Sequence, residues 1–388
     1  MKIIIVTSAA PHPFADTAAR WSFVLIKELL ARGHRVTCFC ATGESQQRIA
    51  DAETLLYAGE DARALKVRFF ELGYQGNALV RRLLSLQRPF SEAYYAPELH
   101  GSLRREMADG YDVLHLEQLW TGWFGTYPRS ILNVHHFEII DHARPALSNL
   151  REWKVFKQME RATERILKGN SRIRVFSERL LDKAKTINPS ARYFVVPFAL
   201  DLSHYPILPA IDEPVAGLIG SMHWLPSRSA AERLLTRIWP LVRAEIPAAR
   251  LIVAGWNARN YLGKFASTAG VEILDSIPHP SEFFSRIAAL IYPVQRGSGM
   301  KVKVIESMAY GVPVVTTPDG VEGLNGHSEV DYIVGETDET IAAATVRLLR
   351  TPSLRAGIRH AGRGLIEREY SRNVVVTQLM KIYKEMIA

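Results

Sequence analysis

The amino-acid sequence predicts an α/β protein with two Rossmann-like domains, and three stretches of the chain indicate this. The chain opens with a strand, a helix and a strand, the β–α–β order that begins a parallel sheet. The stretch His204–Pro214 holds three prolines and shows little periodicity, and a second apolar strand begins directly after it. Further along, Pro293–Leu324 has the pattern of a strand end, a glycine-bearing turn, a helix, a loop and a strand.

The first domain is expected to span residues 1–205. Apolar runs without alternation are typical of parallel strands that are covered on both faces. These runs are Lys2–Thr7, Val36–Cys40, Val67–Leu72, Asp112–Leu116, Ile131–Val134 and Ile173–Phe176. Helical spacing predicts helices at about Ala18–Arg32 and Trp153–Leu167. The first loop lacks the glycine fingerprint of a dinucleotide site, so no nicotinamide cofactor is expected.

The second domain is expected to span residues 214–370, with the linker just before it and a C-terminal helical segment, 371–388, after it. Its predicted strands are Val215–Ile219, Leu251–Ala254, Val271–Leu274 and Leu290–Pro293, followed by a strand that starts near Val312. Its predicted helices are Ala231–Ile246, Glu282–Ala288, Asp338–Leu349 and Ser353–Tyr370, and Val374–Ile387 forms the last helix.

Composition narrows the classes of partner. The chain has 388 residues, of which 47% are hydrophobic, so two full cores are expected and global disorder is excluded. The formal net charge of +8 favours anionic partners such as nucleotide diphosphates, anionic lipid surfaces or nucleic acid. Nucleic acid is the least favoured of these, because the sequence has no zinc-binding cysteine cluster and no basic run interleaved with aromatic residues.

The two cysteines and the N-terminus point to the cytoplasm. Cys38 and Cys40 alternate on one predicted strand, so we expect two small core residues and neither a disulfide nor a metal site. The chain starts directly with a short strand, without the pattern of a signal peptide, and no apolar run approaches the ~18 residues that span a bilayer. Contact with the inner membrane surface stays open, because Asn77–Gln87 is basic and amphipathic. An ordinary solvated helix face explains that segment better, since it is short for a membrane anchor.

The stretch Pro293–Leu324 carries the clearest candidate site. Gly297 and Gly299 allow a sharp bend where the strand gives way to the helix. A helix that opens there directs N–H groups and a positive dipole end at an anion, and phosphate suits such a site best. Lys301 and Lys303 lie at the start of this helix, where cations oppose the helix dipole unless an anion is bound. Glu306, on the same face as Lys303, is placed to accept hydrogen bonds from a ribose diol, although a surface Lys303–Glu306 pair is the alternative.

His135 is the candidate in the first domain. It follows the predicted strand Ile131–Val134, and open α/β sheets bind ligands at the carboxyl ends of their strands. A histidine there suits contact with a sugar or an acceptor, and the alternative is a core histidine that bonds to the backbone.

These residues carry a resemblance to the family-4 retaining glycosyltransferases. Six residues match the second half of that family's donor signature, namely Glu306, Ala309, Gly311, Pro313, Val314 and Val315. The first glutamate of the signature falls on Ser298, which departs from it, whereas Gly297, Gly299, Lys301 and Lys303 fit a variant found in a subgroup. Gly220 opens the Gly-Ser-Met sequence of the same subgroup, and His135 falls on a histidine thought to line the donor sugar. The resemblance covers nearly the whole chain and is strongest over Val215–Leu324.

The resemblance implies the GT-B fold, in which two Rossmann-like domains face a cleft and the last helix crosses back to the first domain. It implies transfer of a hexose-like sugar from a nucleotide diphosphate sugar to a glycan, a lipid-linked or a small-molecule acceptor. Retention at the anomeric carbon and no required metal or cofactor are implied with it. The expected donor-binding residues are Gly220, Gly297, Ser298, Gly299, Met300 and Glu306, and the expected catalytic residues are His135, Lys301 and Lys303.

Three other functions remain open. A sugar-nucleotide epimerase with the same fold would act on the donor without an acceptor. A catalytically silent nucleotide-sugar-binding protein is favoured by Ser298 and by the first loop, which has Ala15–Ala18 where relatives often have glycines. A two-lobed periplasmic binding protein is disfavoured, because no signal peptide is recognised.

Overall fold

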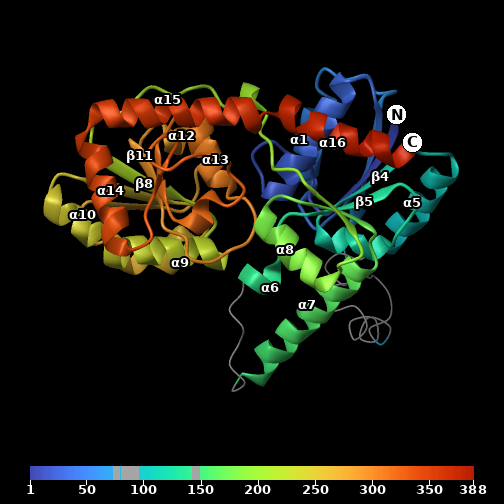
Figure 1. Cartoon of the computed structure of the whole chain (residues 1–388), viewed down its shortest axis with the longest axis horizontal. Helices are drawn as coiled ribbons and strands as arrows, with labels where there is room; N and C mark the ends of the chain where they lie inside the picture. Colours follow the sequence, from blue (N-terminus) through green and yellow to red (C-terminus); the bar gives the residue numbers. More distant parts are fainter. Residues whose placement is uncertain (73–78, 80–95, 142–148) are drawn as a thin grey trace. The chain divides into compact units, whose positions relative to one another are not determined.

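The computed structural model describes residues 1–72, 79, 96–141 and 149–388, which fold as two compact units (Figure 1). Unit 1 comprises Met1–Ile139, Ala143–Leu200 and Arg372–Ala388, and unit 2 comprises Ile140–His142 and Asp201–Ser371. The basic segment Asn77–Gln87 lies outside the described residues except for Leu79. No helix among the described residues has the length and apolar character to cross a membrane.

Unit 1 is built on a seven-stranded parallel sheet in the order β3-β2-β1-β4-β5-β6-β7. Its strands are β1 (Lys2–Thr7), β2 (Arg35–Thr42), β3 (Leu65–Glu71), β4 (Val113–Glu117), β5 (Ser130–Val134), β6 (Arg172–Val175) and β7 (Arg192–Val195). The four residues Ile3, Ile4, Ile5 and Val6 of β1 have no exposed surface. Cys38 and Cys40 on β2 are free thiols and fully buried, which confirms them as core residues, and burial raises the pKa of Cys38 to about 12.

The α-helices of unit 1 begin with α1 (Thr17–Ala31) and end with the C-terminal helix α16 (Arg372–Ile387). Between them lie α2 (Gln46–Tyr57), α5 (Pro97–Ala108), α7 (Leu150–Lys168) and α8 (Glu178–Ile187), with the 3-10 helix η1 (Leu119–Phe124). The short helix α6 (Glu138–Asp141) begins in unit 1, and its last residues, Ile140 and Asp141, belong to unit 2. Helix α16 lies along α1 (Figure 1). The Nε atom of Arg372 is 3.2 Å from the Glu28 carboxylate, and Arg32 donates to the side chains of Asn373 and Thr377. Residues from the two ends of the chain therefore complete one unit.

Unit 2 holds a six-stranded parallel sheet in the order β10-β9-β8-β11-β12-β13. Its strands are β8 (Val215–Ile219), β9 (Arg250–Ala254), β10 (Val271–Leu274), β11 (Ala289–Tyr292), β12 (Val314–Thr316) and β13 (Ile333–Val334). Its α-helices are α9 (Leu225–Arg233), α10 (Trp239–Glu245), α11 (Ala258–Leu262), α12 (Pro280–Phe284), α13 (Val302–Ala309), α14 (Asp338–Arg350) and α15 (Pro352–Glu369). Short 3-10 turns occur at Leu202–His204, Gly263–Phe265 and Pro318–Val321.

Prolines explain where this unit departs from the sequence expectation. The helix predicted at Ala231–Ile246 already begins at Leu225, because Pro226 fits the first helical turn. It becomes a π-helix over Leu234–Ile238, next to Pro240, whose missing N–H interrupts the normal ladder. The helix predicted at Glu282–Ala288 spans Pro280–Phe284 instead and is capped by His279.

The predicted linker packs against unit 2. The Leu208 N–H donates to the Tyr310 carbonyl oxygen at 3.0 Å, and Arg359 donates to the Leu208 carbonyl. The units therefore divide between Leu200 and Asp201, a few residues before the proline-rich stretch.

Candidate active site

The candidate site of unit 2 lies where the direction of strand order changes. Strand β8 is followed in sequence by β9 on one side, whereas β11 lies on its other side. Ligands of open α/β sheets bind outside the carboxyl ends of the strands at such a point. The loop after β8 carries Gly220, and the loop after β11 carries Gly297, Ser298 and Gly299. The fold thus brings together two predicted segments, whose residues Gly220 and Gly297 are 77 positions apart in the chain.

The bend between β11 and α13 requires glycine. Gly297 has φ 124° and Gly299 has φ 76°, values that side-chain-bearing residues rarely adopt. The prediction of a sharp glycine turn is therefore confirmed. The turn positions Lys301 as the N-cap of α13 and Lys303 in its first turn. Met300, predicted to bind the donor, is buried beside them with 7% of its surface exposed.

Two carboxylates bind the backbone of this turn. The N–H and the hydroxyl of Ser298 donate to Asp141 Oδ1 at 2.6 and 2.8 Å. The Gly299 N–H donates to Glu322 Oε1 at 3.0 Å. These two amides were expected to cradle phosphate, and they do attract anionic oxygen atoms. In this structure the anions belong to the chain itself, so a phosphate at these two amides would have to compete with them.

The Lys301 side chain folds back onto the backbone of the turn. Its side chain is 1% exposed, and its ammonium group lies 3.6 Å from Glu322 Oε2. The same group donates to the carbonyl oxygens of Gly297 and Gly299. A buried cation that is paired with a carboxylate and bonded to carbonyls holds a fixed geometry. Lys301 thus adds positive charge at the helix start and also shapes the turn.

Lys303 is held differently, by side chains of the neighbouring loop and strand. Its ammonium nitrogen donates to Ser227 Oγ at 2.6 Å and lies 3.4 Å from the Tyr292 hydroxyl. It also lies 4.7 Å from the centre of the Tyr292 ring and 5.1 Å from that of Trp224, a cation–π arrangement. Burial raises the pKa of Tyr292, which keeps its hydroxyl neutral.

Gly220 is required for this arrangement. A Cβ atom at residue 220 would lie 2.7 Å from Lys303 Nζ and 2.8 Å from Ser227 Oγ. The glycine therefore makes the room in which the ammonium group sits. Arg228, which also follows this loop, stacks over the Tyr261 ring at 4.5 Å.

Glu306 is buried, with 5% of its surface exposed, and its Oε1 accepts a hydrogen bond from the Tyr205 hydroxyl at 3.2 Å. The alternative of an ordinary surface pair with Lys303 is therefore wrong, because the carboxylate is not on the surface. Tyr205 belongs to the stretch that was expected to be a linker. Tyr205 is buried as well, and its hydroxyl orients the Glu306 carboxylate.

In unit 1, His135 lies at the end of β5 within a network of buried polar side chains. Its Nε2 bonds to Glu117 Oε1 and lies 3.0 Å from Asn133 Nδ2, and its ring stacks on Phe176 at 4.5 Å. His135 is thus a buried histidine, and its contacts are with side chains and not with the backbone as the alternative had it. His135 also lines a cavity of about 40 Å³ together with Trp120 and Glu138.

The other hydrogen bonds of this network show which nitrogen of each histidine donates to Glu117. Glu117 Oε2 lies 2.7 Å from His115 Nε2, and His115 Nδ1 lies 2.6 Å from the hydroxyl of Tyr383 on α16. A carboxylate can only accept, so each histidine donates its Nε2–H to Glu117. His115 Nδ1 then accepts from the Tyr383 hydroxyl.

Burial alone would raise the pKa of Glu117, but the charge of His135 and the hydrogen bonds from both histidines lower it well below its usual range. Burial lowers the pKa of His115, despite the opposing influence of Glu117. The fully buried guanidinium of Arg174, over the Trp21 ring at 4.0 Å, adds a compensating positive charge. Burial lowers its pKa to about 10, so it stays charged at neutral pH.

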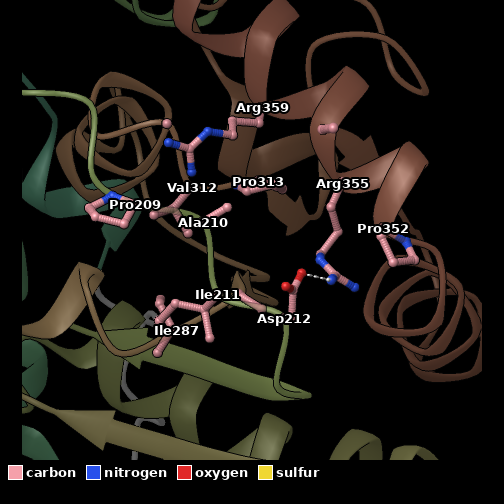
Figure 2. Close-up of a pocket in the computed structure, with 13 residues that line it drawn as sticks. Pro209, Ala210, Ile211, Asp212, Ile287, Val312, Pro313, Pro352, Arg355 and Arg359 are labelled. Atoms are coloured by element: carbon pink, nitrogen blue, oxygen red, sulfur yellow. Dashed lines mark hydrogen bonds and ion pairs between the residues drawn. The ribbon is translucent and has the colours of Figure 1, made fainter.

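A second hollow, in unit 2, lies at the opposite edge of the sheet (Figure 2). Its volume is about 260 Å³, and its lining includes Ala288 and Pro313, which directly precede β11 and β12. Arg355 crosses it to pair with Asp212 at 3.3 Å (Figure 2). Because this is the amino end of the strands, it is not where such sheets bind ligands.

Sequence reasoning missed the partners of the predicted residues. Ser227 and Tyr292 contact the ammonium group of Lys303. The carboxylates of Glu322 and Asp141 accept hydrogen bonds from the turn. Glu117 bonds to His135. Ser227 follows the loop after β8, a position that could have drawn attention. Asp141 carries no signal, because it lies 157 residues from Ser298 in the chain.

Among the described residues, no group of three or more histidine, cysteine, aspartate or glutamate side chains is arranged to hold a metal ion. The expectation of a reaction that needs no metal stays a prediction.

Part of the chain is similar in sequence to known glycosyltransferases. Residues 213–351 match the sequence model of the family Glycosyl transferases group 1. The capsular polysaccharide biosynthesis glycosyltransferase CapM of Staphylococcus aureus is 28% identical over 119 residues, which is 30% of this chain and 31% of that protein. The matched stretch thus spans about a third of that relative.

Solved structures match over the full length. Sucrose-phosphate synthase from Thermosynechococcus elongatus gives a TM-score of 0.73 at 16% identity, covering 100% of this chain and 99% of that one. HepE of Anabaena, solved with UDP-glucose, gives a TM-score of 0.68 at 14% identity, covering 99% and 100%. Identities this low show the fold alone. The chain thus has the GT-B fold, and its residues 213–351 are similar to the glycosyl transferases group 1.

Proposed function

We propose that this protein transfers a sugar from a nucleotide diphosphate sugar to an acceptor. The observation that carries the proposal is the position of Lys303. Its ammonium group stands at the carboxyl edge of the sheet, at the opening of α13, and is oriented by Ser227 and Tyr292. A cation held at a helix N-terminus favours a diphosphate, because the helix dipole and the charge act on the same anion.

In the proposed reaction, the bond between the anomeric carbon and the diphosphate oxygen breaks and a bond to an acceptor hydroxyl oxygen forms. The acceptor proton leaves to the departing diphosphate. Lys303 stabilises the negative charge that develops there, and Lys301 adds positive potential while it holds the turn. Because these lysines and the helix supply positive charge, we propose a reaction without a required metal. Retention of configuration is proposed from the signature around Glu306 alone.

The remaining predicted residues complete the proposed donor site. Gly297, Ser298, Gly299 and Met300 form the wall of the turn, and Gly220 leaves room for the Lys303 ammonium. Glu306, oriented by Tyr205, is proposed to accept hydrogen bonds from the ribose hydroxyls. On unit 1, His135 is proposed to contact the sugar or the acceptor through the Nδ1 side of its ring.

The relatives suggest which compounds to test first. HepE was solved with UDP-glucose, and TarM of Staphylococcus aureus was solved with UDP. CapM acts in capsular polysaccharide biosynthesis. We therefore propose uridine nucleotides and a hexose as the first donors, and a glycan or lipid-linked acceptor as the first acceptor class. The net charge of +8 suits an acceptor at an anionic membrane surface on the cytoplasmic side.

A thermal-shift screen tests the binding half of this proposal. UDP, GDP, UDP-glucose, UDP-N-acetylglucosamine and GDP-mannose are each added at 1 mM, with the matching nucleosides as controls. A ligand at 100 times its Kd adds about 2.7 kcal/mol of stability to the native state. At least one diphosphate should raise the melting temperature while its nucleoside does not. If no diphosphate does so, the proposal fails.

A second assay separates transfer from its alternatives. Release of nucleoside diphosphate is followed with the bound donor, with and without candidate acceptors. Transfer predicts release that rises with an acceptor. An epimerase would convert the donor sugar without any acceptor, and a silent binding protein would leave the donor intact.

A further inference from the structure

Asp141 is a buried carboxylate with only half of its hydrogen-bonding capacity used. It lies at the end of α6 and is 2% exposed. Its Oδ1 accepts the two hydrogen bonds from Ser298, at 2.6 and 2.8 Å. Its Oδ2 is buried as well, and no described residue donates a hydrogen bond to it. Buried carboxylate oxygens without a donor are unusual, because their desolvation is costly.

The unsatisfied oxygen belongs to the candidate donor site. Oδ1 of the same carboxylate is bonded to the middle residue of the turn Gly297–Gly299. The charge of Asp141 also reaches Tyr292, where it adds to burial in raising the pKa of the hydroxyl. Tyr292 is one of the groups that hold Lys303. The Asp141 carboxylate thus lies close enough to this site for its charge to act on a residue that contacts Lys303.

Charge decides which part of a nucleotide sugar fits each group. A phosphate is repelled by Asp141 and attracted by Lys303. A sugar hydroxyl can donate to a carboxylate oxygen, and such charge-assisted bonds are among the stronger ones. In a nucleotide sugar the hexose is joined directly to the diphosphate, so a ligand whose phosphate meets Lys303 brings hydroxyl groups to its immediate surroundings.

We propose that Asp141 Oδ2 accepts a hydrogen bond from one hydroxyl of the donor hexose, which makes Asp141 a specificity-determining residue. This inference rests on the proposed function, because it assigns the sugar end of the same donor. Ser298, the residue that replaces the signature glutamate, then holds the carboxylate in place through two hydrogen bonds. The hexose must carry a hydroxyl at the position that meets Asp141.

The substitution Asp141→Asn tests this with little disturbance. The asparagine oxygen can still accept both hydrogen bonds from Ser298, and the amide nitrogen takes the place of Oδ2 without its charge or its acceptor character. Asp212→Asn is the matched control, since it removes one carboxylate charge from unit 2 on a side chain that is 94% exposed. Affinities for UDP and UDP-glucose are measured by calorimetry on all three proteins.

For Asp141→Asn we expect UDP affinity within about twofold of wild type and UDP-glucose affinity lowered about 10- to 100-fold, the range for a hydrogen bond to a charged group. Asp212→Asn should change neither affinity. Donors that lack one hydroxyl then identify the contact. One deoxy-sugar donor should bind wild type more weakly than UDP-glucose does. If Asp141 contacts the missing hydroxyl, Asp141→Asn should bind that donor and UDP-glucose equally well, as a double-mutant cycle requires.

The outcomes separate the two proposals. If wild type binds UDP and the sugar contributes equally to affinity in wild type and Asp141→Asn, the assignment of Asp141 is wrong and the proposed function stands. A lower melting temperature of Asp141→Asn with unchanged ratios of UDP to UDP-glucose affinity leads to the same conclusion and leaves Asp141 as an anchor of the turn. If wild type binds no nucleoside diphosphate and no nucleotide sugar in the screen, both proposals fall.

Discussion

The ammonium nitrogen of Lys303 lies 2.6 Å from the hydroxyl oxygen of Ser227, although the two residues are 76 positions apart in the chain. Ser227 lies in the first turn of α9, and Lys303 in the first turn of α13. Their contact therefore links the loops that leave β8 and β11. Because Ser227 holds the ammonium group in place, the proposed binding of a diphosphate would cost less side-chain entropy.

Removal of this hydroxyl should weaken diphosphate binding without unfolding the protein. We expect Ser227→Ala to lower UDP affinity about 3- to 10-fold, because the Lys303 ammonium group then loses the hydrogen bond that holds it in position. Ser229→Ala on the same helix is the control, because its hydroxyl donates to the backbone carbonyl oxygen of Pro226 within the helix. Calorimetric titration of both variants is the measurement, and equal affinities would show that Ser227 has no part in the site.

The assignment of Glu306 to ribose makes a separable prediction. Glu306→Gln keeps the size of the side chain, so the fold should persist, while a ribose diol bound to the carboxylate should lose ~1–3 kcal/mol of binding free energy. Tyr205→Phe removes the hydroxyl that orients Glu306 and should produce a smaller loss. UDP titration and thermal melting are measured on both variants. A reduced melting temperature with unchanged UDP affinity would make the Tyr205–Glu306 contact structural only.

His135→Ala should lower turnover and leave UDP affinity nearly intact. The reason is that its proposed partner is the sugar or the acceptor, whereas the proposed diphosphate contacts lie in unit 2. A loss of kcat without a change in diphosphate affinity marks an interaction that is stronger in the transition state. Glu117→Gln should give the same pattern more weakly, because it alters only the orientation and protonation of the ring. A stable His135→Ala protein with full activity would remove His135 from the site.

The buried network of unit 1 predicts an acid-labile fold. The folded-state pKa of His115 lies below its ordinary value of 6.5, so the unfolded chain binds the extra proton first. The free energy of unfolding should therefore fall as the pH drops below about 6.5, by up to ~1.4 kcal/mol per pH unit for one proton. The pKa of Glu117 is also lowered, and its contribution is lost further down, below its ordinary value of 4.5.

Denaturant unfolding between pH 4 and pH 8 measures this slope. His115→Gln preserves a donor toward Glu117 and removes the titrating ring, so its stability should depend less on pH between 5 and 6.5. An unchanged slope in that window would mean that another group is responsible.

The strands of this protein were predictable from the sequence, because short uninterrupted apolar runs are typical of parallel strands that are covered on both faces. The bounds of β1, β8 and β10 are the predicted ones, Lys2–Thr7, Val215–Ile219 and Val271–Leu274. Helices with mixed composition were harder. The helix at Leu225 was expected six residues later, although Pro226 fits a first helical turn.

The candidate site was predictable as far as its local pattern extends. The turn at Gly297 and Gly299 and the helix that carries Lys303 follow from glycine chemistry and periodicity. The carboxylates that bind the turn do not, because they come from distant positions and have no pattern of their own. Ser298 and Asp141 are 157 residues apart, and only the folded chain brings them into contact. The same holds for Tyr205 and Glu306, separated by 101 residues.

The most direct test of the diphosphate site is the affinity of Lys303→Ala for UDP and for uridine. Lys264→Ala, on an exposed turn of unit 2, is the charge-matched control. The account predicts that wild type binds UDP much more tightly than uridine, and that Lys303→Ala loses about 10-fold or more of that difference, as expected for a charge-assisted contact. Lys264→Ala should retain it. Equal UDP affinities for wild type, Lys303→Ala and Lys264→Ala would contradict the assignment of the diphosphate to this site.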